Sequence, residues 1–245
     1  MGRVTKPTPQ FPFSKGLMPQ EEMLETGKKN KRITIGIPKE SDTSECRIPL
    51  TPEAVEMLVE EGHEIIIEKG AGNLAHYTDN NYSERGGQIV ETSQEVYKSE
   101  IILKVAPLQL SETEFLKENQ VIISSLHLSN SAGQYLRNLM QKRITAIAFE
   151  SILDEDGAFP LVQAMSSIAG STSILVAAEY LSNVNKGKGV MLGGVTGITP
   201  TEVVILGAGT AAEFAARAAL GLGATVKVFD DSIKRLNESS KTFTV

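Results

Sequence analysis

The feature that constrains the fold most is a run of five pieces between residues 202 and 230. Residues 202–206 read EVVIL, which indicates a buried strand, and residues 207–212 read GAGTAA, in the pattern G-x-G-x-x-G/A. A stretch with helical spacing of apolar residues follows, and a second strand over 225–229 ends at Asp230. Strand, glycine turn, helix, strand and acid occur in the order of a Rossmann dinucleotide-binding unit.

Each position of the glycine turn has a physical reason. Gly207 permits a tight turn, Gly209 lets the backbone approach a pyrophosphate, and Ala212 lets the helix pack on the strand. Thr210 lies in the same turn, where the helix N-terminus offers free N–H groups and a positive dipole end to phosphates. We therefore predict that these four residues bind a dinucleotide. The alternative is a glycine turn that binds no ligand.

Asp230 lies 23 residues after Gly207 and is placed to accept hydrogen bonds from ribose hydroxyls. A 2'-phosphate would meet like charge there, so NAD is the expected cofactor. Arg235 nearby keeps NADP open. A full dinucleotide fold needs several more strands than the two before Val245, so we expect the second domain to be C-terminally truncated.

A regular rhythm of short apolar runs begins at Ile33. The runs read as buried strands separated by stretches with helical spacing, which predicts an α/β domain with a parallel sheet covered on both faces. A helix rich in Ala and Ser is expected over about 161–181, joining two Rossmann-like, doubly wound domains, the second incomplete. The expected divisions are an N-terminal arm, loose or packed on a neighbouring subunit, a substrate or catalytic domain, a linking helix and the start of an NAD-binding domain: 1–32, 33–160, 161–186 and 187–245.

Composition narrows the class of protein. Hydrophobic residues make up 41% and charged residues 22%, as in globular proteins, and a net charge of -6 argues against nucleic acid as a partner. Cys46 is the single cysteine, so no intrachain disulfide forms, which fits a reducing compartment. We find no signal peptide and no apolar run of the roughly 18 residues that a membrane span needs. A cytoplasmic protein is expected.

Three residues of the first domain are candidates for chemistry. His127 follows a predicted strand at the edge where parallel sheets bind ligands, and it can exchange protons near neutral pH. Lys104 lies within an apolar strand, where an ammonium is costly unless it is paired or used. Arg47 precedes a helix that Thr51 is expected to cap, and its planar fork suits a carboxylate. The alternatives are a structural histidine, an edge lysine facing water and a surface arginine. No Cys/His cluster suggests a metal.

From about Ile33 onward the chain resembles bacterial alanine dehydrogenases. The resemblance is carried by ordered matches along roughly 210 residues: GIPKE (36–40), RIPLTP (47–52), GAG (70–72), LKV (103–105), LHL (126–128), IAFE (147–150), MS with IAG (165–170), GGV with Gly197 (193–197) and VILGAGT (204–210). Several matches in order are far more specific than one motif.

The resemblance implies NAD-dependent oxidative deamination of L-alanine to pyruvate and ammonia, and the reverse. In the family an arginine and a lysine hold the substrate and a histidine is the acid/base, and these roles carry over to Arg47, Lys104 and His127. The family's cofactor-contacting serine carries over to Ser166, and its ribose-side acid and basic residue carry over to Asp230 and Arg235. A homo-oligomer, often a hexamer, is implied for the full-length protein.

The sequence departs from the family in places. Ala106-Pro107-Leu108 stands where the family has Lys-Glu-Pro, and Ser171 stands where many members have arginine. The family's catalytic aspartate would lie beyond Val245, which leaves the activity of this chain alone open. Two alternatives remain: the NAD-binding subunit of a proton-translocating transhydrogenase, and a non-catalytic NAD-binding remnant.

Overall fold

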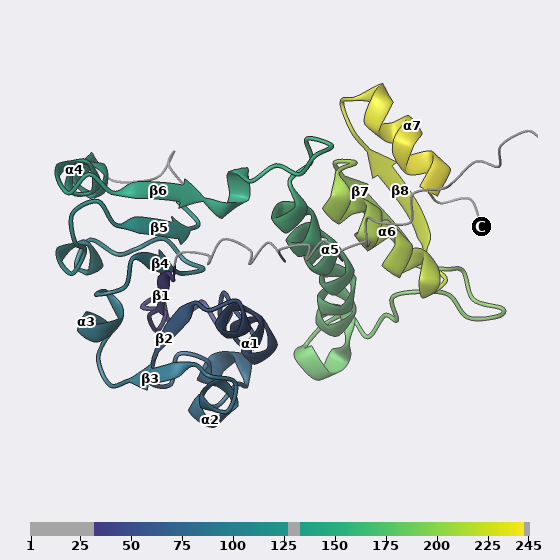
Figure 1. The fold of residues 1–245 in the computed structure, drawn as a ribbon. Coiled ribbons are helices and arrows are strands. Elements are labelled where there is room, and N and C mark those ends of the chain that lie inside the picture. Colours follow the sequence, from purple (N-terminus) through teal and green to yellow (C-terminus); the bar gives the residue numbers. More distant parts are fainter. Residues whose placement is uncertain (1–31, 127–132, 243–245) are drawn as a thin grey trace, which may run out of the picture.

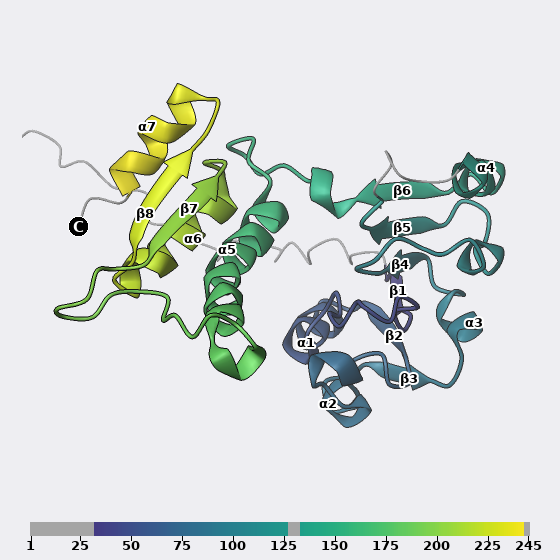
Figure 2. The same cartoon turned by 180° about the vertical axis from the view of Figure 1, so that it is seen from behind.

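The structure is a computed structural model that describes residues 32–126 and 133–242. It contains two parallel sheets, with the long helix α5 (Pro160–Leu181) between them (Figure 1). The same arrangement is seen from behind, where α5 again separates the larger sheet from the smaller one (Figure 2). Residues 1–31, most of the expected arm, lie outside the described residues, as does His127.

The larger sheet is parallel throughout and has the strand order β3-β2-β1-β4-β5-β6. Its strands are β1 (Thr34–Ile37), β2 (Glu64–Glu68), β3 (Gln88–Val90), β4 (Ile101–Leu103), β5 (Val121–Ser124) and β6 (Thr145–Ala148). The connections contain α1 (Pro52–Glu60), α2 (Asp79–Ser83), α3 (Ser93–Val96) and α4 (Gly133–Gln141), with short 3-10 turns η1 (Asn73–Ala75), η2 (Glu112–Glu114) and η3 (Phe149–Ser151). This is the doubly wound order, so the predicted fold class is confirmed.

The order reverses between β1 and β4. The chain leaves β1 toward β2 and β3, and it leaves β4 toward β5 and β6. The connections from these two neighbouring strands therefore diverge, and a crevice opens at their carboxyl ends, where doubly wound sheets bind ligands. We call this crevice, where the strand order reverses, the switch point. The residues directly after β1 and β4 lie in it.

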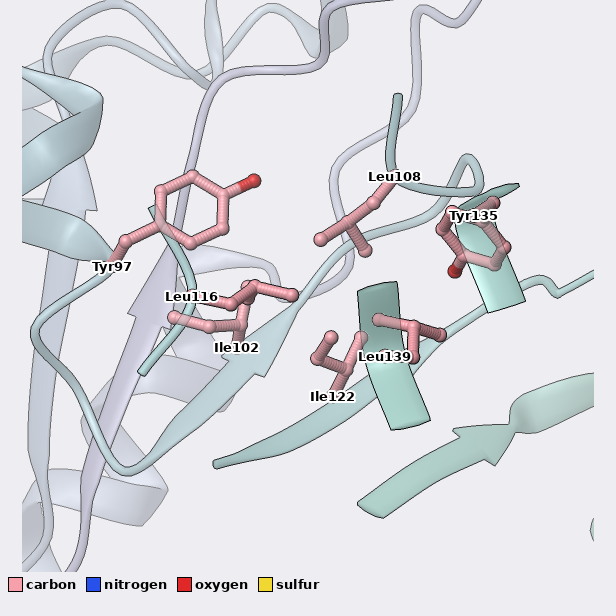
Figure 3. Close-up of a cluster of buried hydrophobic side chains, with 7 residues drawn as sticks. All are labelled: Tyr97, Ile102, Leu108, Leu116, Ile122, Tyr135 and Leu139. Carbon is pink, nitrogen blue, oxygen red and sulfur yellow. The ribbon is translucent and has the colours of Figure 1, made fainter. Parts of the chain in front are cut away.

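Strand register assigns the two cores to opposite faces of the sheet. Ile35 of β1 pairs with Ile65 and Ile101, whereas Gly36 pairs with Ile102, which in turn pairs with Ile122. Because side chains alternate along a strand, Ile102 and Ile122 face the side away from Ile65. One core gathers Ile37, Val55, Ile65, Ile67 and Tyr82 under α1 and α2. The other gathers Tyr97, Ile102, Leu108, Leu116, Ile122, Tyr135 and Leu139 (Figure 3).

Helix α1 begins as its sequence predicts. Thr51 has an extended backbone and accepts a hydrogen bond from the Ala54 N–H at 3.4 Å, and Pro52 occupies the first helical turn. The cap satisfies an N–H that has no partner within the helix, and proline lacks the N–H that would otherwise be unpaired there. This start fixes the loop before it, which carries Arg47.

The predicted joining helix is α5. The sequence has no unbroken apolar run of about 18 residues, but an 18-residue window of α5 reaches a mean hydropathy of 1.5. The apolar run is interrupted by Ser, Thr and Gly, which lower the hydropathy little and add no charge. By length and composition alone, α5 could cross a membrane, but one such helix is weak evidence of a membrane span. Its buried side, at Gly170 and Ile174, packs on protein.

The smaller sheet pairs β7 (Glu202–Leu206) with β8 (Thr225–Phe229) in parallel, with α6 (Thr210–Gly221) between them in sequence and α7 (Ile233–Thr242) after them. Val203, Ile205 and Val226 face a core formed with α5 and α6. The opposite face leaves Leu206 82% exposed and Phe229 54% exposed. Within the described residues this sheet has two strands, as the sequence predicted.

Gly170 sets the distance between α5 and α6. A Cβ at Gly170 would lie 2.1 Å from the Ala211 carbonyl oxygen and 3.0 Å from the Phe214 Cβ. Because the first obstacle is backbone, the helices must separate to admit a methyl group. The glycine brings the start of α6, and with it the glycine turn, against the middle of α5.

We predict that Gly170→Ala destabilises the protein although alanine favours helix. The separation of α5 and α6 is expected to cost about 1–3 kcal/mol, more than the roughly 1 kcal/mol gained from helix propensity. Gly221→Ala at the end of α6 is the matched control, because a Cβ there meets nothing within 4 Å. Thermal and urea unfolding measure both variants; equal stabilisation by both would contradict the close-packing account.

Candidate active site

A cavity of about 650 Å³ lies at the carboxyl ends of the larger sheet, against α5. Its walls come from four connections that leave neighbouring strands and from one side of α5. The lining residues are Asp42, Glu45, Arg47, Val105, Ala106, Pro107, Ser125, Phe149, Glu150, Leu161, Val162, Met165, Ser166 and Ala169. The cavity thus adjoins the switch point, where the fold predicts a ligand.

Arg47 lines this cavity with its side chain 52% exposed. It donates from Nε to Glu45 Oε1 at 2.7 Å and from a terminal nitrogen to Glu45 Oε2 at 2.6 Å. These hydrogen bonds raise the pKa of Arg47 and lower the pKa of Glu45, so both remain charged. The two-point contact fixes the guanidinium plane and leaves its other N–H groups for a second carboxylate.

Lys104 follows β4 and its side chain is fully buried. Its Nζ lies 2.7 Å and 2.9 Å from the two carboxylate oxygens of Glu112, and 3.6 Å from Glu40 Oε2. The alternative of an edge lysine that faces water is therefore wrong, because this ammonium is paired within the protein. Lys104 stands behind the cavity wall, next to the lining residue Val105.

Glu40 follows β1 and lies beside Lys104. Its Oε1 accepts a hydrogen bond from the Val105 N–H at 2.7 Å, while its Oε2 is buried and accepts none. Burial, more than any neighbour, raises the pKa of Glu40. The switch point therefore contains one ammonium and two carboxylates, one of them incompletely hydrogen-bonded.

His127 lies outside the described residues, and its neighbours define where the connection begins. Ser125 and Glu150 line the cavity, and the Leu126 N–H donates to Glu150 Oε1 at 2.9 Å. These contacts hold the chain at the cavity up to the residue before His127.

Ser166 lies on α5 and lines the same cavity as Arg47. One turn later, Gly170 contacts Ala211 of the glycine turn closely. Helix α5 therefore connects the cavity of the first sheet with the turn that follows β7.

The glycine turn has the geometry that its sequence predicts. Gly207 has φ +102°, a left-handed conformation that favours glycine, and Gly209 precedes α6 without a side-chain cap. A Cβ at either glycine would meet nothing within 4 Å, so the space in front of the turn is open. Thr210 begins α6 and Ala212 lies in its first turn, where unpaired N–H groups point outward. This geometry suits a bound phosphate.

Asp230 closes the turn from the end of β8. Its carboxylate accepts hydrogen bonds from the Ser232 N–H and from the Ala208 N–H, each at 2.7 Å. The Ser232 N–H, then the Ala208 N–H, lower the pKa of Asp230, and Arg235 adds a weaker attraction at 3.8 Å. Asp230 therefore holds the shape of the glycine turn.

Sequence reasoning missed Glu112, Glu45 and Glu40 as members of the site. Glu112 lies in a polar run, SETE, that gives no sign of burial. Glu45 lies two residues before Arg47, the predicted substrate-binding residue. This spacing was the only sign in the sequence that the two could form an ion pair. In the described ranges, no three His, Cys, Asp or Glu residues gather in a way that could hold a metal ion.

Together, the sheet order, the cavity at the switch point and the glycine turn define a class: a doubly wound α/β protein in which a long helix links a ligand cavity to a Rossmann unit. Residues 36–169 match the family described as Alanine dehydrogenase/PNT, N-terminal domain, and residues 173–245 match Alanine dehydrogenase/PNT, C-terminal domain. The chain belongs to the alanine dehydrogenase/PNT family.

Individual relatives agree with this assignment. The alanine dehydrogenase of Methanococcus maripaludis is 43% identical over 205 residues, which are 83% of this chain and 55% of that protein. The alanine dehydrogenase of Staphylococcus epidermidis is 38% identical over 86% of this chain and 57% of its own length. The chain therefore spans little more than half the length of these relatives.

Solved structures agree as well. A structure of L-alanine dehydrogenase superimposes with a TM-score of 0.80 at 37% identity, covering 86% of this chain and 58% of the other. A transhydrogenase from Sinorhizobium meliloti has a TM-score of 0.74 at 21% identity, with coverage of 85% and 62%. The second likeness shows the fold alone.

The hydrogen bonds to Asp230 predict a pH-dependent contribution to stability. A carboxyl whose pKa is lower in the folded state than its usual 3.8 stabilises the fold above that value. The contribution is lost as the pH falls through the lower, folded value. Asp230→Asn should therefore melt below the parent near about pH 6, and the difference should shrink below about pH 4. Asp156→Asn, at an exposed turn, is the control; a difference that does not change with pH would contradict the assignment.

Proposed function

We propose that this chain forms the substrate-binding domain and the first part of the nucleotide-binding domain of an NAD-dependent dehydrogenase. The proposed reaction interconverts L-alanine with pyruvate and ammonia. The observation that carries the proposal is that Arg47 and Ser166 line the same cavity, which adjoins the switch point and the helix that contacts the glycine turn. The proposed divisions are 33–160 for the substrate domain, 161–186 for the linking helix and 187–245 for the start of the nucleotide-binding domain.

NAD fits the second part of the chain. The open space before Gly207 and Gly209 admits a pyrophosphate, and the first turn of α6, with Thr210 and Ala212, offers N–H groups to it. Asp230 has the position and the charge to accept hydrogen bonds from ribose hydroxyls and to repel a 2'-phosphate, with Arg235 beside it. When bound, the nicotinamide supplies or accepts the hydride of the reaction.

The first part of the chain supplies groups for a 2-oxo acid. Arg47 is held by Glu45 on one edge, and we assign its free edge to the substrate carboxylate. Lys104 would donate a hydrogen bond to the carbonyl oxygen, and His127 would carry protons as ammonia adds and water leaves. Overall, pyruvate, ammonium, NADH and a proton give alanine, NAD⁺ and water. Val105, Ala106 and Phe149 provide an apolar wall that suits the methyl group.

The surface and the family support two further proposals. Leu175, Val176 and Tyr180 of α5 and Leu206 of β7 are well exposed, and burial of such groups between copies fits a homo-oligomer of the whole protein. We also propose a cytoplasmic location, which fits the single cysteine, exposed Cys46.

The test is oxidation of NADH, followed at 340 nm, with pyruvate and ammonium. It is run on this chain and on a chain completed with the C-terminal segment of the Methanococcus maripaludis relative. We expect turnover by the completed chain. Arg47→Lys should lower kcat/KM for pyruvate by about 10- to 100-fold, because a point charge replaces a two-point contact to carboxylate.

The effect should be specific to pyruvate. The KM for NADH is expected to change little in Arg47→Lys, and Arg85→Lys, in a surface ion pair with Glu53 and Glu56, is expected to match the parent. A completed chain that binds NADH without turning over pyruvate would reject the activity and favour the transhydrogenase-like or non-catalytic alternative.

A further inference from the structure

The ammonium of Lys104 is built into a buried network at the switch point. Lys104 follows β4, Glu40 follows β1, and Glu112 comes from η2 in the connection between β4 and β5. The Lys104 side chain is 0% exposed and those of Glu40 and Glu112 are 6% and 11% exposed. A buried charge is stable only when groups of opposite charge or hydrogen-bond partners lie next to it. The ammonium of Lys104 therefore depends on Glu112 and Glu40.

Glu112 is itself held in place by other donors. Its Oε1 accepts a hydrogen bond from the Tyr97 hydroxyl at 3.1 Å, and its Oε2 accepts one from the Gln109 N–H at 2.7 Å. Burial first, and then the charge of Glu112, raise the pKa of Tyr97, so the phenol stays neutral and continues to donate. With Lys104 included, three different groups fix the Glu112 carboxylate.

The Lys104 ammonium donates hydrogen bonds of different length. Two short contacts, 2.7 Å and 2.9 Å, go to the two oxygens of Glu112. The ammonium also donates a longer hydrogen bond to Ser41 Oγ at 3.4 Å and lies 3.6 Å from Glu40 Oε2, and both residues belong to the segment that continues to the cavity residues Asp42 and Arg47. The bond to Ser41 is therefore the longest of the three hydrogen bonds that the ammonium donates.

We infer that Glu112 is the positioning residue of Lys104: its two short hydrogen bonds hold the ammonium so that the N–H now bonded weakly to Ser41 can turn to a substrate oxygen that enters from the cavity side. The inference rests on the proposed function, in which Lys104 contacts the carbonyl oxygen. It adds a residue that touches no substrate and acts through Lys104. A neutral residue in place of Glu112 removes the nearest negative charge from the buried ammonium. It also removes the two hydrogen bonds that fix the orientation of the ammonium.

Among the described residues, a small set of charged and titratable groups surrounds this pair. Lys104 faces Glu112 and Glu40, with Asp42 farther away, and Glu112 also faces Tyr97 and Tyr135. The two tyrosines have pKa values raised by burial and stay neutral through ordinary assay conditions. Glu112 is therefore the carboxylate in closest contact with the ammonium.

The experiment compares Glu112→Gln with Glu114→Gln, the exposed acid two residues later in the same 3-10 turn. In the completed chain, Glu112→Gln is expected to lower kcat/KM for pyruvate by about 10- to 100-fold, the loss of a charged hydrogen-bond pair, with the KM for NADH nearly unchanged. The alkaline limb of the pH profile should move to lower pH. Glu112→Asp should restore part of the rate, and Tyr97→Phe should shift the profile weakly in the same direction.

The inference is overturned if Glu112→Gln has the pH profile of Glu114→Gln. It is also overturned if rate, NADH affinity and stability all fall together without movement of the alkaline limb, because a merely structural residue gives that result. Should Glu112→Gln fail to fold, Glu112→Asp and Tyr97→Phe carry the same comparison.

A second readout separates this inference from the proposed function. In NMR spectra of this chain without the added C-terminal segment, Lys104 should give a slowly exchanging ammonium signal that disappears in Lys104→Arg. The signal should be lost or broadened in Glu112→Gln and kept in Glu114→Gln. If pyruvate turnover is absent but this pattern holds, the proposed reaction fails while the Glu112–Lys104 positioning stands. A signal unaffected by Glu112→Gln overturns the positioning whatever the activity.

Discussion

The parallel pairing of β1 with β4 is the constraint on which the rest of the site depends. The chain leaves these two neighbouring strands in opposite directions, so the residues directly after them share a crevice instead of covering it. That crevice places Glu40 and Lys104 together from positions 64 residues apart, with Ser41 beside the ammonium. The buried charges are stable there because each has a partner, and the cavity lies in front of them.

Helix α5 connects this crevice with the glycine turn. Many of its apolar side chains are exposed in this chain, and the two sides that do make contacts have different roles. Ser166 and Met165 face the cavity, whereas Gly170 and Ile174 pack toward α6. Because Gly170 is small, α6 and the glycine turn pack closely against α5, the same helix that lines the cavity. Substrate and cofactor positions are thereby linked through packing.

Local signals were readable from the sequence because they depend on neighbouring residues. The unit from β7 to Asp230, the Thr51 cap with Pro52 and the two covered faces of the larger sheet follow from spacing and local chemistry. The Glu112 contact was not readable, because it depends on how a polar turn folds back over β4.

The central claim is that the cavity in front of the switch point takes the 2-oxo acid beside the cofactor. The most direct measurement is a crystal structure of the completed chain with NADH and pyruvate. The account predicts the pyruvate carboxylate against the guanidinium of Arg47 and the carbonyl oxygen toward Lys104, with the pyrophosphate at Gly207 and Gly209. Pyruvate bound away from Arg47, or a cofactor that leaves the glycine turn empty, would contradict it.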